Sequence, residues 1–187
     1  YPDVKVYGPK NPKIEGIDLR LSEGESLSLS NPQLDLNILE TPGHTLDHIV
    51  FYNKELMFCG DTLFSAGCGR MFEGTPEVFY HSLQKLARLP EQTKVYCTHE
   101  YTLANLAFAA HVDPENKVLH DYQNWANTQR ESNKITLPSS IGEQKKINPF
   151  LRCANKQIKQ NIQNIMNLSA NSEVDVFAAL RSCKDHF

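Results

Sequence analysis

The feature that most constrains the fold is a change of pattern near residue 99. Residues 1–98 are mainly short apolar stretches separated by Gly, Pro and Asn, whereas the segments after His99 are longer and have helical spacing. This contrast predicts an α/β part followed by an almost entirely helical part. We expect a first domain over residues 1–105 and a second over 106–187.

Within the first part, residues 35–38 alternate polar and apolar side chains, and residues 49–52 and 55–59 flank Asn53-Lys54 as a predicted hairpin. Residues 94–97 form a further predicted strand. Between them, Thr75 and Pro76 indicate a helix start, and Pro90 follows its end. The apolar stripe predicted for this helix consists of Val78, Phe79, Leu83, Leu86 and Ala87.

The second part contains predicted helices at residues 103–111, 116–132, 153–168 and 172–181. Ser172 and Asp175 have the spacing of a capping box at the start of the last helix. Residues 138–140 and 148–149 are predicted to be loops between helices.

Composition excludes several function classes. The 187 residues carry a net charge of −3, which gives no basic field for nucleic acid, and contain no apolar run of the ~20 residues that span a bilayer. Five cysteines form an odd set without a Cys-x-x-Cys pair, which argues against a disulfide framework. We therefore expect a cytoplasmic protein that binds neither nucleic acid nor membrane. A monomer is expected as well, although no sequence feature indicates the oligomeric state.

Three candidate metal ligands follow predicted strands, in loops of small residues. They are His44, Asp61 and His99. Imidazole nitrogen and carboxylate oxygen suit zinc, iron or manganese, and a carboxylate can bridge two cations. From the residues alone, a hydrogen-bonded turn histidine and an Asx turn remain the simpler interpretations.

Longer motifs around these residues narrow the interpretation. They read Thr-Pro-Gly-His-Thr (41–45), Phe-Cys-Gly-Asp-Thr-Leu-Phe (58–64), Gly-Cys-Gly-Arg-Met-Phe-Glu-Gly (67–74), Thr-His-Glu-Tyr-Thr (98–102), Asn-Pro-Phe-Leu-Arg (148–152) and Leu-Arg-Ser-Cys-Lys-Asp-His-Phe (180–187). In this order and spacing they resemble glyoxalase II, the hydroxyacylglutathione hydrolases of the metallo-beta-lactamase superfamily. The resemblance implies an αββα sandwich, here incomplete, followed by an all-helical substrate domain.

The resemblance also implies a binuclear site. His44 would bind the first of two divalent metal ions, Asp61 would bridge them, and His99 would bind the second, with zinc expected and iron or manganese possible alternatives. The expected nucleophile is a metal-bound hydroxide, with Asp61 as ligand rather than general base. The implied reaction is hydrolysis of S-D-lactoylglutathione to D-lactate and glutathione, which belongs to methylglyoxal detoxification.

By the same resemblance, residues near the metals line a glutathione pocket: Arg70, Met71 through its backbone, Phe72, His99 and Tyr101. Some members have Tyr where this chain has Phe72, so one hydroxyl contact is missing here. Arg181 and Lys184 match a basic pair that holds the glycine carboxylate of glutathione. Without the resemblance, a basic helix C-terminus that complements the helix dipole explains this pair equally well.

One family element is absent from the 187 residues, a His-x-His-x-Asp-His loop that supplies further ligands to both metals. The chain also begins at Tyr1 rather than Met. We therefore expect that the active protein includes a preceding segment, and that this chain alone binds metal weakly and is poorly active. Two alternatives remain open, a glutathione persulfide dioxygenase of the same superfamily and a catalytically silent glutathione-binding fragment.

Overall fold

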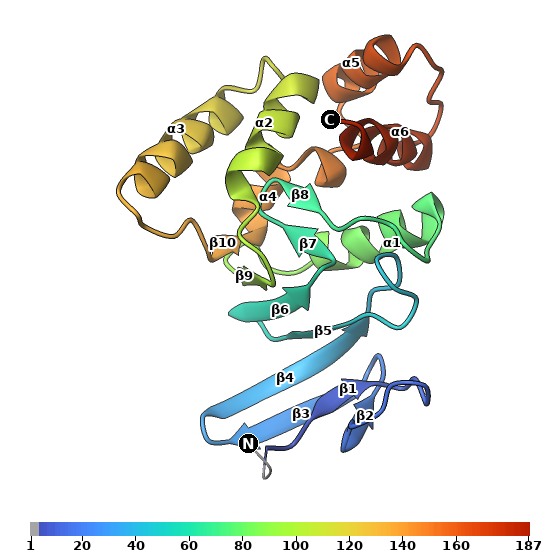
Figure 1. Cartoon of the computed structure of the whole chain (residues 1–187), viewed down its shortest axis with the longest axis vertical. Coiled ribbons are helices and arrows are strands. Elements are labelled where there is room, and N and C mark those ends of the chain that lie inside the picture. The colour runs from blue at the N-terminus through green and yellow to red at the C-terminus, as the bar shows by residue number, and fades with distance from the viewer. Residues whose placement is uncertain (1–3) are drawn as a thin grey trace.

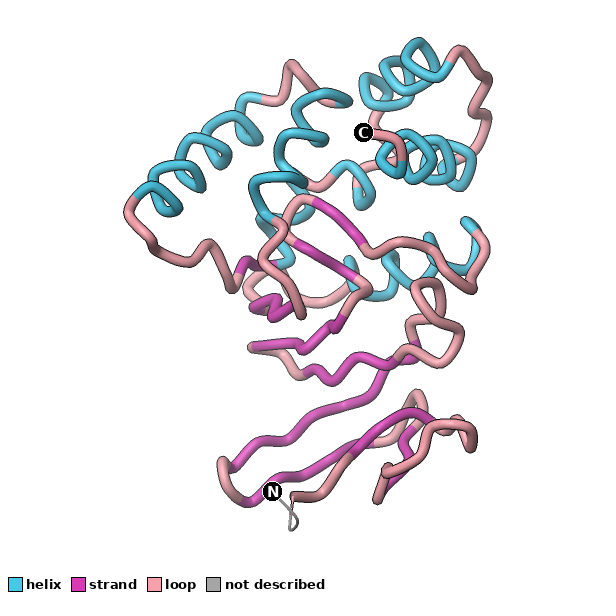
Figure 2. The backbone as a smooth tube through the Cα atoms, viewed as in Figure 1, coloured by secondary structure: helices cyan, strands magenta, loops and turns pink. Residues whose placement is uncertain are grey.

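The computed structural model describes residues 4–187 and contains a mixed sheet with helices gathered at one end (Figures 1 and 2). The six-stranded sheet has the order β10-β9-β6-β5-β4-β3. Its strands are β3 (Ser26–Ser30), β4 (Gln33–Glu40), β5 (Ile49–Tyr52), β6 (Leu56–Gly60), β9 (Lys94–Cys97) and β10 (Ser139–Ser140). Only β6 and β9 run parallel to each other, and all other neighbours are antiparallel.

Two short pairs of strands accompany this sheet. Strands β1 (Tyr7–Pro9) and β2 (Leu19–Leu21) pair in parallel, and β7 (Leu63–Phe64) pairs antiparallel with β8 (Gly67–Cys68). The predicted hairpin is confirmed, because β5 pairs with β6 across Asn53-Lys54. In Figure 1, β7 and β8 lie between the large sheet and the helices, so they connect the two parts of the molecule.

Helix α1 (Pro76–Ala87) covers one face of the sheet and begins as predicted. The Thr75 side chain accepts a hydrogen bond from the Val78 amide, which satisfies one free donor of the first turn. The predicted apolar stripe is wrong at Val78, which is 36% exposed, whereas Tyr80 is buried. On the opposite face of the sheet Phe58 and Tyr96 remain exposed, with their ring centroids 5.5 Å apart.

The helical part consists of α2 (Thr102–Val112), α3 (Lys117–Glu131), α4 (Ile141–Ile147), the 3-10 helix η1 (Pro149–Leu151), α5 (Lys156–Met166) and α6 (Glu173–Asp185). The capping box at Ser172 and Asp175 is confirmed. The predicted loop at 138–140 is wrong in part, because Ser139 and Ser140 form β10 against β9 and Ser140 caps α4. Helix α4 is not among the helices predicted from the sequence.

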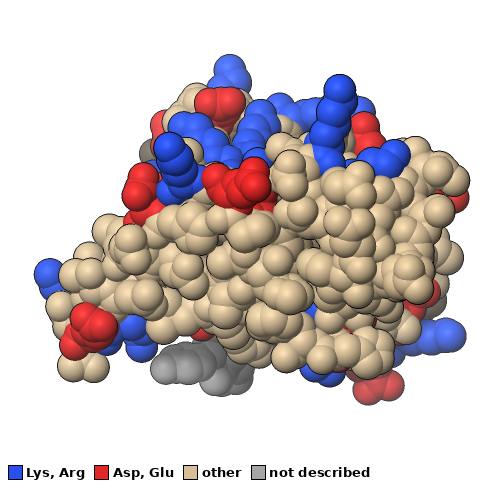
Figure 3. Space-filling view, turned by 90° about the horizontal axis from the view of Figure 1, so that it is seen from above, with Lys and Arg blue, Asp and Glu red and all other residues tan. Residues whose placement is uncertain are grey.

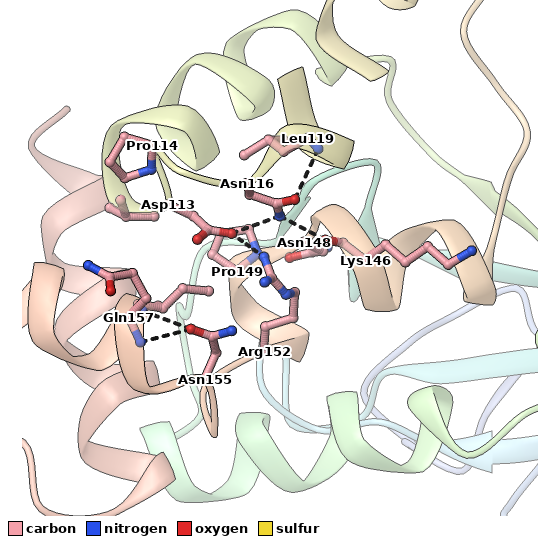
Figure 4. Close-up of polar contacts among 12 residues, drawn as sticks. Asp113, Pro114, Asn116, Leu119, Lys146, Asn148, Pro149, Arg152, Asn155 and Gln157 are labelled. Carbon is pink, nitrogen blue, oxygen red and sulfur yellow. Dashed lines mark hydrogen bonds and ion pairs between the residues drawn. The ribbon is translucent and has the colours of Figure 1, made fainter. Parts of the chain in front are cut away.

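A polar network joins several helices (Figure 4). The Arg152 guanidinium forms an ion pair with Asp113, and the Asn116 amide donates to the same carboxylate at 2.8 Å and to the Lys146 carbonyl at 2.9 Å. Asn155 caps α5 by accepting from the Gln157 and Ile158 amides. The contacts of Asn116 with the Lys146 carbonyl and of Asn155 with the first amides of α5 satisfy backbone groups at helix ends that would otherwise be unpaired.

The main hydrophobic core is shared by both parts. Val50 and Met57 of the sheet belong to one cluster with Leu83 of α1 and with Phe150 and Phe177 of the helical part. The expected boundary after residue 105 falls inside α2, and it stays a prediction. The α/β class with a helical C-terminal part is confirmed.

The surface carries charges of both signs. Seen from the helical end (Figure 3), acidic and basic side chains gather along one margin and leave much of this face uncharged. Within residues 4–187, no helix is long and apolar enough to cross a membrane.

Candidate active site

The three predicted ligands lie just beyond the ends of β4, β6 and β9. Because β6 and β9 are parallel neighbours, their carboxyl ends meet at one edge of the sheet and bring Asp61 and His99 together. The His99 Nε2 atom lies 3.6 Å from Asp61 Oδ1. His44 lines the same cavity, so the structure brings together all three candidates.

The backbone fixes the His44 ring. Its Nδ1 atom lies 2.8 Å from the Arg70 carbonyl oxygen. Because a carbonyl only accepts hydrogen bonds, Nδ1 carries a proton, and in the neutral ring Nε2 then keeps a free lone pair. In metal-binding histidines, the ring nitrogen that does not bind the metal typically donates a hydrogen bond of this kind, which sets the tautomer and the ring orientation.

Gly69 allows this loop to pack closely on the ligands. A Cβ atom at this position would lie 2.0 Å from the Asp61 carbonyl oxygen and 3.2 Å from His44 Nδ1. Any side chain at position 69 would therefore displace the backbone of Asp61.

His48 is a third histidine at the site, and its ring hydrogen-bonds to the segments around it. Its Nε2 atom lies 3.2 Å from the Asp61 amide nitrogen, and its Nδ1 atom lies 3.0 Å from Thr62 Oγ1 and 3.2 Å from Thr41 Oγ1. Burial lowers the pKa of His48, and the nearby His44 lowers it further.

Two basic residues of α6, Arg181 and Lys184, line the same cavity. Arg181 is only 3% exposed, and its guanidinium donates to the carbonyls of Cys68 and Gly69 and to the Asp185 carboxylate. Among residues 4–187, the buried Arg181 Nε finds no hydrogen-bond partner. Burial and the charge of Arg181 lower the pKa of the neighbouring Lys184 to about 8. This part of the cavity lining therefore carries positive charge.

The cavity has a volume of about 540 Å³, which is in the range of small-molecule sites. Of the remaining predicted substrate residues, Arg70, Phe72 and Tyr101 line it, whereas Met71 does not and packs its side chain against the main core. Tyr101 stacks on His99, with ring centroids 4.9 Å apart. The full lining is His44, Asp61, Phe64, Cys68, Gly69, Arg70, Phe72, His99, Tyr101, Asn105, Arg181 and Lys184.

Sequence reasoning missed Asn105. Its amide donates to the Ser65 carbonyl at 3.0 Å, which ties α2 to the β7–β8 turn. Its position four residues after Tyr101, one helical turn further on, was the available signal.

The described residues fit a divalent metal in kind but not in arrangement. His44 Nε2, His99 and Asp61 are suitable ligand types that line one cavity. However, no group of three or more His, Cys, Asp or Glu side chains in residues 4–187 is close enough together to hold a metal ion.

The sheet, the strand-end ligands and the cavity define a class of protein. Residues 2–99 match the Metallo-beta-lactamase superfamily, and this membership implies divalent metal ions. A solved structure with a similar fold is ETHE1 from Myxococcus xanthus, at 25% identity and a TM-score of 0.57, covering 96% of this chain and 66% of that one.

The second part narrows the class. Residues 100–187 match the family described as Hydroxyacylglutathione hydrolase C-terminus. A hydroxyacylglutathione hydrolase of Pseudoalteromonas translucida is 48% identical over 100% of this chain and 72% of its own length. One of Idiomarina loihiensis is 49% identical over 97% of this chain and 71% of its own length. The chain thus belongs to the hydroxyacylglutathione hydrolase family of thioester hydrolases, which favours hydrolysis over persulfide oxidation.

Proposed function

We propose that this site hydrolyses S-D-lactoylglutathione to D-lactate and glutathione. The observation that supports this most is one cavity lined both by metal-ligand side chains and by the basic pair Arg181 and Lys184. A glutathione thioester has the matching polarity, with a reactive carbonyl at one end and carboxylates at the other. In the reaction, the OH group of a water molecule is added to the acyl carbon and the C–S bond breaks. The departing thiolate takes the other proton of that water and becomes the thiol of glutathione.

Each residue has a proposed role in binding or orientation. Lys184 would bind the glycine carboxylate through a charge-assisted hydrogen bond, and the Arg181 guanidinium would add positive charge beside it. Tyr101 and Phe72 would pack along the tripeptide, and Arg70 would add positive charge at the cavity mouth. These contacts would hold the thioester carbonyl between His44 and His99.

Two divalent metal ions, with zinc as the expected metal, would be held in part by His44, Asp61 and His99. The remaining ligands would come from outside these three residues. When bound, such ions acidify water and polarise a carbonyl. The expected monomeric state and cytoplasmic location stay predictions; the five free cysteines support a reducing compartment.

The test compares two proteins, the 187-residue chain and an extended protein in which a segment with the His-x-His-x-Asp-His loop precedes it. Hydrolysis is followed by loss of thioester absorbance, and metal content is determined on the same samples. We expect turnover and about two zinc ions per chain in the extended protein, and loss of both in its Asp61→Asn variant. An extended protein that binds zinc and substrate without turnover would contradict the proposal.

A second candidate is a silent glutathione-binding fragment, which the lack of a complete ligand group in residues 4–187 favours for this chain alone. It predicts glutathione binding without hydrolysis even in excess zinc. Turnover by the 187-residue chain would exclude it.

A further inference from the structure

His48 lies beside the ends of β4 and β6 and just before the start of β5. Thr41 follows β4, His48 precedes β5, and the Gly60-Asp61-Thr62 turn follows β6. The imidazole contacts all of these segments, through Thr41 Oγ1, Thr62 Oγ1 and the Asp61 amide, and the two threonine hydroxyls lie 3.0 Å apart. Both threonines are fully buried, so these hydrogen bonds have no competing water.

The contacts determine the tautomer of His48. A backbone N–H can only donate, so Nε2 accepts from Asp61 and carries no proton. The proton of the neutral ring is therefore on Nδ1, where the hydroxyls of Thr41 and Thr62 can accept it. A His48 ring with the proton on Nε2 would leave the Asp61 amide without this partner.

Gly60 makes this approach possible. Its φ of 51° is in the left-handed region, and a Cβ atom there would lie 2.6 Å from His48 Nε2. The turn that carries Asp61 is thus shaped around the imidazole. The predicted metal ligands do not include His48, and it does not line the cavity.

We propose that His48 is a positioning residue that holds the backbone of Asp61 through its unprotonated Nε2 and thereby aims the Asp61 carboxylate at the metal site. The inference rests on the proposed function for the role of Asp61 as a ligand. Loss of the hydrogen bond between His48 and the Asp61 amide would reorient Asp61 without removing any metal ligand. Comparable losses of hydrogen bonds around metal ligands weaken metal binding about 10–100-fold.

Two variants separate positioning from bulk. His48→Gln keeps an acceptor oxygen near the place of Nε2, whereas His48→Leu fills similar space without an acceptor. His81→Leu makes the same change on an exposed position of α1 and serves as the matched control. Circular dichroism and thermal unfolding establish that each variant folds.

The first readout needs no metal. Nitrogen-15 NMR of the 187-residue chain reports which ring nitrogen of His48 is protonated, and hydrogen exchange reports protection of the Asp61 amide. We expect Nδ1 protonation in the wild type, with amide protection retained in His48→Gln and lost in His48→Leu. A proton on Nε2, or equal protection in wild type and His48→Leu, would overturn the inference. If His48→Leu does not fold, the inference is tested by the protonated ring nitrogen of the wild type and by Asp61 amide protection in His48→Gln.

The second readout is zinc affinity of the extended protein, measured by competition with a chelator. We expect affinity about 10–100-fold weaker in His48→Leu and near the wild-type value in His48→Gln and His81→Leu. Equal affinities in wild type and His48→Leu would overturn the inference. If the variants follow the expected pattern but the extended wild type does not cleave the thioester, the inference stands and the proposed function fails.

Discussion

At the residue scale, burial and the neighbouring Arg181 disfavour the charge of Lys184 and lower its pKa to about 8. Its ammonium lies 4.8 Å from the centroid of the Phe108 ring, a cation–π contact that offsets only part of this cost. Below this pH the side chain is charged, and above it the charge is lost. An anionic group bound nearby would offset part of the desolvation of this ammonium.

This gives a pH prediction for ligand binding. The affinity of the chain for S-methylglutathione, a thioether that cannot be hydrolysed, should be level below pH 8 and fall above it, because Lys184 loses its attraction for the carboxylate. Lys184→Met should bind about tenfold more weakly at neutral pH. Calorimetric titrations on both sides of pH 8 measure this.

The variants provide the control, because the ligand amine also titrates at high pH. Lys54→Met removes an exposed lysine away from the cavity and should keep the wild-type profile. A Lys184→Met profile with the same fall above pH 8 as the wild type would show that another group is responsible.

At the element scale, α6 carries the basic pair and depends on its N-terminal cap. Ser172→Ala removes the side-chain half of the capping box and should lower the free energy of unfolding by about 1 kcal/mol, or roughly 2–4 °C in Tm. Ser169→Ala changes an exposed serine in the preceding loop and should have no measurable effect. Equal Tm values for the two variants would contradict a stabilising cap.

Elements with strong local signals were predictable. The Thr75 and Ser172 caps are side-chain to backbone contacts within three residues, so the sequence alone identifies the starts of α1 and α6. Strand β10 and helix α4 were missed because they are short, and β10 exists only through its pairing with β9. Val78 is exposed because the stripe of α1 is rotated toward Tyr80, which hydrogen-bonds Glu173 of α6.

The residues of the candidate site also divide into those that the sequence could predict and those whose contacts only the fold shows. His44, Asp61 and His99 could be assigned because their motifs resemble those of a known family. The contacts of His48, Asn105 and Arg181 join segments far apart in the chain, and only the fold shows them. The burial of Arg181 among backbone carbonyls is an example, since it limits how many of its donors a ligand could use.

At the scale of the whole molecule, the shared core predicts that the sheet and the helices unfold together. Phe177 of α6 packs against Phe79 of α1 and Phe150 of η1, with ring centroids 5.8 and 5.9 Å apart. Phe177→Ala should cost about 3–5 kcal/mol of unfolding free energy. Phe187→Ala, at a ring that is 62% exposed, should cost far less.

Urea unfolding followed by NMR measures this coupling. The amides of Met57 in β6 and Leu119 in α3 should disappear at one urea concentration in the wild type and at one lower concentration in Phe177→Ala. Separate midpoints for the two amides in the wild type would mean that the parts are independent units.

The central claim is that the strand-end ligands and the basic residues of α6 belong to one glutathione site. The most direct test is NMR mapping of the 187-residue chain during titration with S-methylglutathione. We predict that the amides of Gly69, Tyr101 and Lys184 shift along a single saturation curve, because all three residues line the same cavity. No saturable shift, or shifts confined to residues outside this cavity, would contradict the account.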